Sequence, residues 1–153
     1  MKGSDAMRHP WIGVVVCGAL AGAMTLAAPR ESAAGAAAVP IEAAPWKPVF
    51  PDQPTGPVMA VLWGDAKKGP VGFLLKFPAG AVVPTHVHSS DYQGVVISGD
   101  FSHAAGSDPA VALAPGSYWS QRARLPHVNR CSDAGPCVVY LTAPKGFDLT
   151  FIK

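Results

Sequence analysis

The residues of this chain whose type and spacing best suit chemistry are histidines. His86 and His88 flank a single valine in the segment Pro84-Thr85-His86-Val87-His88. On a β-strand, residues i and i+2 point to the same face, so both imidazoles would be directed at one place. Imidazole is a common ligand of divalent transition metals, and a ligand from another strand would complete a site. His127 is the candidate third ligand; the alternative is that these histidines are hydrogen-bonded polar groups of a metal-free barrel.

The composition indicates what kind of fold must position these histidines. Of 153 residues, 49% are hydrophobic and 14% are charged, while Gly and Pro contribute 16 residues each. So few charges and so many apolar residues argue against disorder, and so many turn formers argue against a helical bundle. The net charge of +2 supplies no basic patch, so we expect no nucleic-acid partner.

Short apolar runs separated by turn formers predict an all-β domain. In Val71–Phe77 every second residue is a large apolar one, Val71, Phe73, Leu75 and Phe77, while Gly72, Leu74 and Lys76 fall on the other face. Segments such as Pro78-Ala79-Gly80 and Pro115-Gly116 mark turns. No stretch has sustained helical periodicity. The runs expected to be strands are Met59–Trp63, Val71–Phe77, Ala81–His88, Tyr92–Ser98, Asp100–His103, Ala110–Leu113, Ser117–Gln121, His127–Arg130, Val138–Thr142 and Phe147–Ile152. Their number and spacing predict an antiparallel sandwich or barrel.

The N-terminal segment, residues 1–38, has the layout of a signal peptide. Lys2 and Arg8 precede an uncharged apolar run, Trp11–Ala28, and small residues follow it at positions that a signal peptidase could read. We therefore expect a periplasmic or secreted protein. The alternative is an uncleaved segment that anchors the chain in a membrane, because the apolar run is barely long enough to span a bilayer.

Two further features follow once this segment is set aside. Residues 39–57 are rich in Pro and predict an extended arm, with Trp46 and Phe50 as its anchors on the domain at 58–153; by analogy such an arm could serve a homodimer. In an oxidising compartment Cys131 and Cys137 are expected to form a disulfide across a turn-forming loop. A metal-binding or redox role for this pair ranks lower, since the spacing is not C-x-x-C.

The histidine spacing resembles that of the cupin superfamily, whose members are RmlC-like jelly rolls. Gly80, His86-x-His88, Tyr92 and Gly99 are similar to the first cupin motif, and Pro115-Gly116 with Pro126-His127 resembles the second. The resemblance implies a double-stranded β-helix with a metal inside the barrel. It extends to a cupin-like family of uncharacterised function and to the cupin domain of zinc-binding anti-sigma factors, although the sigma-binding part is absent. The phrases that carry it are Leu62-Trp63-Gly64-Asp65, Pro84-Thr85-His86-Val87-His88, Gly94-Val95-Val96-Ile97-Ser98-Gly99 and Pro115-Gly116-Ser117-Tyr118-Trp119.

The chain departs from the cupin pattern where that superfamily has a glutamate ligand. Tyr92 occupies this position and Gln93 follows it, so neither offers a carboxylate. The resemblance then implies three neutral histidines with open metal positions, or a weak fourth ligand from Tyr92 or Gln93. Zn, Fe, Mn and Ni ions all suit three imidazoles. Tyr118 and Gln121 precede the loop that leads to His127, and both are expected to line the pocket.

Two classes of function fit these features. The first is a metal-dependent oxygenase, lyase or isomerase that acts on a small oxygen-rich molecule. The second is a non-catalytic module that binds or senses a metal or small ligand, and the missing glutamate slightly favours it. His103 is expected at an exposed strand end, with a place lining the barrel mouth as the alternative. Arg122, Arg124 and Arg130 are expected at a solvated edge, and the alternative is that they attract an acidic substrate.

Overall fold

In the computed structural model, residues 30–31 and 37–152 are described, and nearly all regular structure among them is β. The elements are β1 (Arg30–Glu31), β2 (Ala37–Ala38), the 3-10 helix η1 (Ile41–Ala43), β3 (Lys47–Pro48), β4 (Val58–Gly64), β5 (Val71–Phe77), β6 (Val82–Val87), β7 (Tyr92–Ser98), β8 (Phe101–Ala105), β9 (Val111–Leu113), β10 (Tyr118–Gln121), β11 (His127–Cys131), β12 (Cys137–Ala143) and β13 (Thr150–Phe151). The predicted all-β class is confirmed. Within the described residues, no helix is long and apolar enough to cross a membrane.

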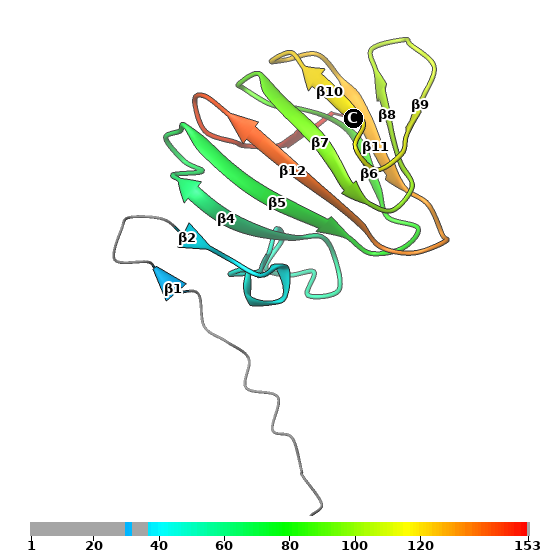
Figure 1. The fold of residues 1–153 in the computed structure, drawn as a ribbon. Coiled ribbons are helices and arrows are strands. Elements are labelled where there is room, and N and C mark those ends of the chain that lie inside the picture. Colours follow the sequence, from blue (N-terminus) through cyan, green and yellow to red (C-terminus); the bar gives the residue numbers. More distant parts are fainter. Residues whose placement is uncertain (1–29, 32–36, 153) are drawn as a thin grey trace, which may run out of the picture.

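The strands form two antiparallel sheets that lie face to face (Figure 1). One sheet has the order β10-β7-β12-β5-β4-β3 and the other the order β13-β6-β11-β8-β9, while β1 and β2 pair separately. Neighbours in each sheet are mostly distant in sequence, because the chain passes repeatedly from one sheet to the other. This exchange brings β6 and β11, which carry the cupin-like histidines, side by side.

The core lies between the sheets and follows the alternation seen in the sequence. Val71, Phe73, Leu75 and Phe77 of β5 are all buried. Across the ladder, Leu141 of β12 faces Phe73, so large apolar side chains stack in the same layer. Burial of each such side chain stabilises the fold by about 1.5–3 kcal/mol. The two central strands of the larger sheet thereby supply one wall of the barrel interior.

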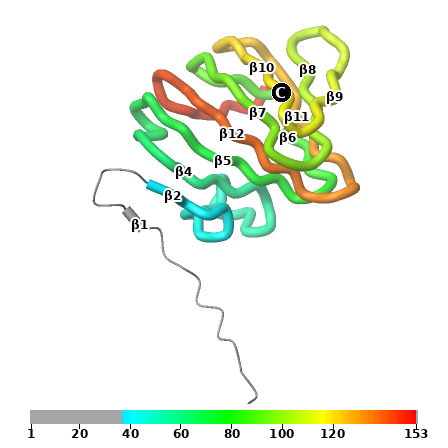
Figure 2. Tube along the Cα trace, viewed as in Figure 1, coloured from blue at the N-terminus to red at the C-terminus, as the bar shows by residue number. Residues whose placement is uncertain are grey.

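The Pro-rich arm joins the larger sheet rather than standing apart from it. Its strand β3 pairs with β4, at the sheet edge, and Figure 2 shows the arm running along that side. The Trp46 indole N–H donates to the Ile41 carbonyl at 3.0 Å, within the arm. The Phe50 ring lies 5.9 Å from that of Phe151 between centroids, so Phe50 connects the arm to the C-terminal strand. The boundary at residue 57 stays a prediction.

The disulfide expected between Cys131 and Cys137 is present, with the two Cα atoms 5.8 Å apart. Cys131 ends β11 in the smaller sheet and Cys137 begins β12 in the larger one, so the bond ties the two sheets at one end of the barrel. The predicted signal segment, apart from residues 30–31 and 37–38, lies outside the described residues.

The last predicted strand, Phe147–Ile152, is shorter than expected, since only Thr150–Phe151 pairs with β6. The preceding residues make other bonds. The Asp148 carbonyl accepts from the His88 ring, and the Asp148 carboxylate accepts from the Ser89 N–H at 2.7 Å. These contacts hold the segment across the histidine cluster instead of in a ladder.

Candidate metal centre

His86, His88 and His127 come together inside the barrel. Strand alternation predicted a shared face for His86 and His88, and the cupin-like spacing implied that His127 joins them. His86 in β6 is the direct cross-strand partner of His127 at the start of β11, and His88 follows the end of β6. Their ring centroids are 4.0 Å apart for His86–His127, 5.0 Å for His86–His88 and 5.1 Å for His88–His127. Each side chain is no more than 2% exposed. One nitrogen from each ring lies within 4.8 Å of the other two, which suits a shared metal ion.

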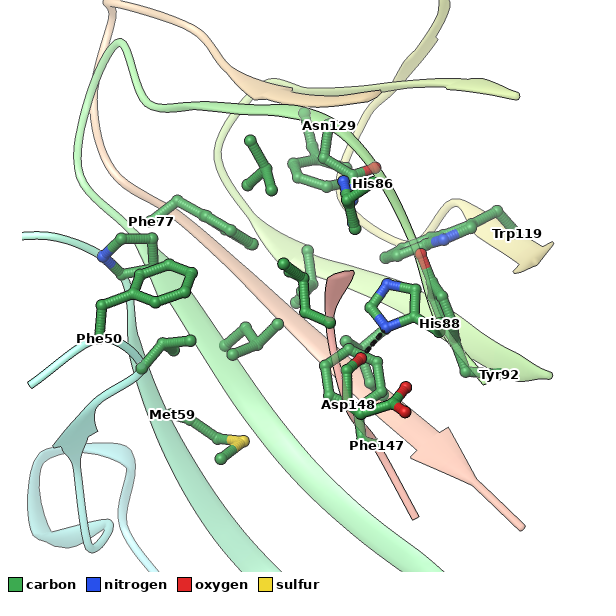
Figure 3. Close-up of a pocket in the computed structure, with 18 residues that line it drawn as sticks. Phe50, Met59, Phe77, His86, His88, Tyr92, Trp119, Asn129, Phe147 and Asp148 are labelled. Atoms are coloured by element: carbon green, nitrogen blue, oxygen red, sulfur yellow. Dashed lines mark hydrogen bonds between the residues drawn. The ribbon is translucent and has the colours of Figure 1, made fainter. Parts of the chain in front are cut away.

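In all three rings, the Nδ1 atom bonds a backbone carbonyl, which fixes the orientation of the ring. The Nδ1 of His86 lies 2.8 Å from the Pro84 carbonyl, and the Nδ1 of His127 lies 3.1 Å from the Leu125 carbonyl. The Nδ1 of His88 bonds the Asp148 carbonyl (Figure 3). A carbonyl can only accept, so each Nδ1 must carry the hydrogen and each Nε2 retains its lone pair. This assigned tautomer is the one in which Nε2 can bind a metal.

The electrostatic environment keeps these imidazoles neutral. Burial lowers the pKa of His88 to about 4 and that of His127 to about 3, and it also lowers the pKa of His86. Repulsion among the histidines acts in the same direction, while the carbonyl bonds oppose it. At neutral pH the cluster therefore offers three uncharged rings, the form that metal ligation requires.

Tyr92, at the position of the cupin glutamate, lies within the cluster. Its side chain is buried, and its hydroxyl donates to the Nε2 of His127 at 3.1 Å. Burial raises the pKa of Tyr92 to about 12, so the phenol is neutral at physiological pH. Gln93 is exposed because adjacent strand residues face opposite ways, so it does not reach the histidines as a fourth ligand would.

The two predicted pocket residues, Tyr118 and Gln121, lie on opposite faces of β10. Tyr118 is 58% exposed, and its predicted place in the pocket is wrong because residues i and i+3 of a strand cannot share a face. Gln121 is buried but does not line the cavity, so its predicted place there is also wrong; its amide donates to the Leu125 carbonyl at 2.8 Å instead. That carbonyl also accepts from His127, so Gln121 helps to fix the segment that orients a candidate ligand.

Sequence reasoning missed His103, which is buried rather than exposed. Its Nδ1 lies 2.8 Å from the Asn129 Oδ1, and its ring centroid is 5.3 Å from that of His127. Strand alternation contained a signal, because His103 stands two residues after the apolar Phe101 and must share its inward face. A fourth histidine therefore lies beside the cluster without belonging to the three-nitrogen set.

A cavity of about 290 Å³ opens beside the histidines (Figure 3). Phe147 closes one side, where its ring lies 4.5 Å from that of His88 between centroids. Most of the other walls are apolar. The cavity is lined by Val49, Phe50, Pro57, Met59, Leu75, Phe77, Val83, His86, His88, Tyr92, Phe101, Trp119, Asn129, Val139, Leu141, Phe147, Asp148 and Leu149.

Solved structures with the same architecture are cupins and related proteins. The DMSP lyase DddQ from Ruegeria pomeroyi DSS-3 superposes with a TM-score of 0.61 at 17% identity, covering 72% of this chain but 61% of that protein. An RmlC-like cupin from Shewanella frigidimarina NCIMB 400 superposes with a TM-score of 0.54 at 16% identity, covering 68% of this chain and 86% of that one. A chain from the complex of Rhodobacter sphaeroides SigE with the anti-sigma ChrR superposes with a TM-score of 0.53 at 20% identity, covering 68% of this chain and 50% of that one.

These likenesses confirm the double-stranded β-helix, or cupin jelly roll, that the motifs implied. At such low identity they concern the fold alone. No curated protein sequence matches the chain. One family model does match, over residues 38–149, and its description is a domain of unknown function, DUF4437. The chain therefore belongs to the DUF4437 family and has the cupin fold.

Proposed function

We propose that His86, His88 and His127 hold a divalent metal ion, and that the protein is a metal-dependent cupin enzyme acting on a small molecule in the adjoining cavity. One observation carries this proposal. Three buried, neutral imidazoles have their Nδ1 atoms bonded to backbone carbonyls, which leaves the lone pair of each Nε2 available as a metal ligand. Two of these histidines, His86 and His88, line the cavity, and the Nε2 of His127 accepts from the Tyr92 hydroxyl. Three protein nitrogens with room for a further ligand are typical of catalytic rather than closed structural sites.

The reaction classes that suit this site are lyase, isomerase and oxygenase chemistry. A bound Zn, Fe, Mn or Ni ion would polarise an oxygen atom of the substrate as a Lewis acid. Tyr92 would donate a hydrogen bond to that oxygen, since its phenol is neutral and lies beside His127. Phe147 and the apolar walls would exclude water, which strengthens both interactions. The lyase class also occurs on this fold in DddQ, which is a DMSP lyase.

The alternative is a non-catalytic module that binds a metal or small ligand. One observation favours it: within the part of the chain that the structure describes, no carboxylate joins the three-histidine cluster. The Asp148 carboxylate bonds the Ser89 N–H, and that of Asp91 bonds the Ala123 N–H at 2.7 Å. For proton transfer, an enzyme at this site would have Tyr92, an ion-bound group and Asp148, the one acidic residue of the cavity lining.

Elemental analysis of the purified protein tests the metal site. We expect one equivalent of metal after loading, and its loss in His86→Ala but not in the matched control Gln93→Ala, whose side chain is exposed. No bound metal under any loading would overturn the proposal. Assays with diketones and phenols then separate the classes. Oxygen uptake indicates an oxygenase, product without oxygen uptake indicates a lyase or isomerase, and saturable binding without turnover supports the alternative.

We also propose that the protein is exported and acts in the periplasm or outside the cell. The basic start and apolar run of residues 1–38 support export, as does a disulfide, which persists in oxidising compartments. Cell fractionation and N-terminal sequencing of the mature protein test this. A full-length chain in the cytoplasm would contradict it.

A further inference from the structure

We infer that the cavity beside the candidate metal centre selects a small molecule with one oxygen-bearing end and an uncharged, apolar body the size of a substituted ring. This inference rests on the proposed function, because the oxygen-bearing end would face the metal. It differs from the sequence-based expectation of an oxygen-rich ligand.

The polar and apolar groups of the cavity are segregated. The lining residues with polar side-chain atoms are His86, His88, Tyr92, Trp119, Asn129 and Asp148. Figure 3 shows Phe50 and Met59 across the cavity from His88 and Tyr92. A hydroxyl or carboxylate placed among these apolar groups would lose its bonds to water without replacement. Only one end of the ligand can therefore be polar.

The charge of the lining disfavours an anion. Among the described residues that line the cavity there is no Lys or Arg, and the one carboxylate belongs to Asp148. Arg122 and Arg124 are exposed on the loop before β11 and do not line the cavity. An anionic group away from the metal would thus be desolvated with no protein cation to pair with it. We conclude that the body of the ligand is uncharged.

The volume limits the ligand to one ring with short substituents. A cavity of about 150 Å³ is enough for benzene, and this one measures about 290 Å³. It would hold a molecule of about ten to fifteen non-hydrogen atoms. The arm contributes Phe50 to the far wall, so residues outside the core strands help to set this limit.

Hydroxamates that share one metal-binding group but differ in their bodies test the inference. Calorimetry on the zinc-loaded protein should show benzohydroxamate binding about ten- to a hundredfold more tightly than acetohydroxamate, because its ring buries additional apolar area. A carboxylate in the para position should weaken binding at least tenfold. Phe50→Ser should reduce the preference for the ring several-fold. If Phe50→Ser does not fold, Met59→Gln should show the same reduction. Ile97→Ser, at an exposed site, should leave the preference unchanged.

A metal-free measurement separates this inference from the proposed function. Toluene added to the zinc-free protein should shift the methyl NMR signals of Leu75 and Leu141, which line the cavity. If zinc does not bind but toluene does, the proposed metal site fails and the apolar selectivity stands. If zinc binds but both hydroxamates bind equally, or the para carboxylate strengthens binding, the inference is overturned and the metal site stands.

Discussion

Acidifying the metal-free protein from pH 7 to pH 5 should reduce its free energy of unfolding through the histidine cluster. Burial holds the folded pKa of His88 at about 4 and that of His127 at about 3, whereas an unfolded histidine has a pKa of about 6.5. Between these values the unfolded chain binds protons that the folded chain does not. Stability is therefore full above pH 6.5 and is lost progressively as the pH falls toward the folded pKa values.

The magnitude follows from the same values. At pH 5 the protonation of each unfolded histidine costs about 1–2 kcal/mol of stability, so His88 and His127 together cost about 2–4 kcal/mol. The lowered pKa of His86 adds in the same direction. Asp148 makes no contribution in this range, because its pKa is lowered from an ordinary value of 3.8. The predicted loss is a large part of the 5–15 kcal/mol typical of a small domain.

Urea denaturation in EDTA at pH 7 and pH 5, followed by tryptophan fluorescence, measures this loss. The variant His88→Asn keeps a polar side chain but has no titration in the window, so its loss should be smaller by about 1–2 kcal/mol. Equal stability at both pH values, or greater stability at pH 5, would refute the reasoning. An unchanged loss in His88→Asn would show that other groups titrate.

Three other outcomes are expected. Tyr92→Phe removes the hydroxyl that bonds His127 but leaves every candidate ligand nitrogen in place. Zinc affinity should therefore change less than about threefold, while turnover falls at least tenfold. A parallel loss of zinc binding in calorimetry would make Tyr92 a ligand instead. Gly94→Val should destabilise the protein by about 1–3 kcal/mol and alter tryptophan fluorescence, because a Cβ there would overlap the Trp119 indole; unchanged melting would contradict that packing. Reduction of the Cys131–Cys137 disulfide should cost about 2–3 kcal/mol in urea titrations, and no change in midpoint would show that the bond is energetically neutral.

Much of this molecule could be predicted from local patterns. Alternation in Val71–Phe77 identified a core strand, and the i, i+2 spacing of His86 and His88 placed both rings on one face. The cupin-like spacing then brought His127 to the same centre. These predictions held because strand geometry has a period of two, so the facing of a side chain can be read without knowing its partner.

Other features depended on contacts between distant segments. Segments far apart in the chain decide three features of the site. These are the burial of His103, the carbonyls that orient the histidine rings, and the walls that Phe50 and Phe147 give the cavity. The sequence by itself determined the all-β class, the candidate ligand histidines and the disulfide. Only the tertiary structure decided the tautomers, the place of Tyr92 against His127 and the apolar character of the cavity, because hydrogen bonds and burial depend on which strands and crossing segments meet in space.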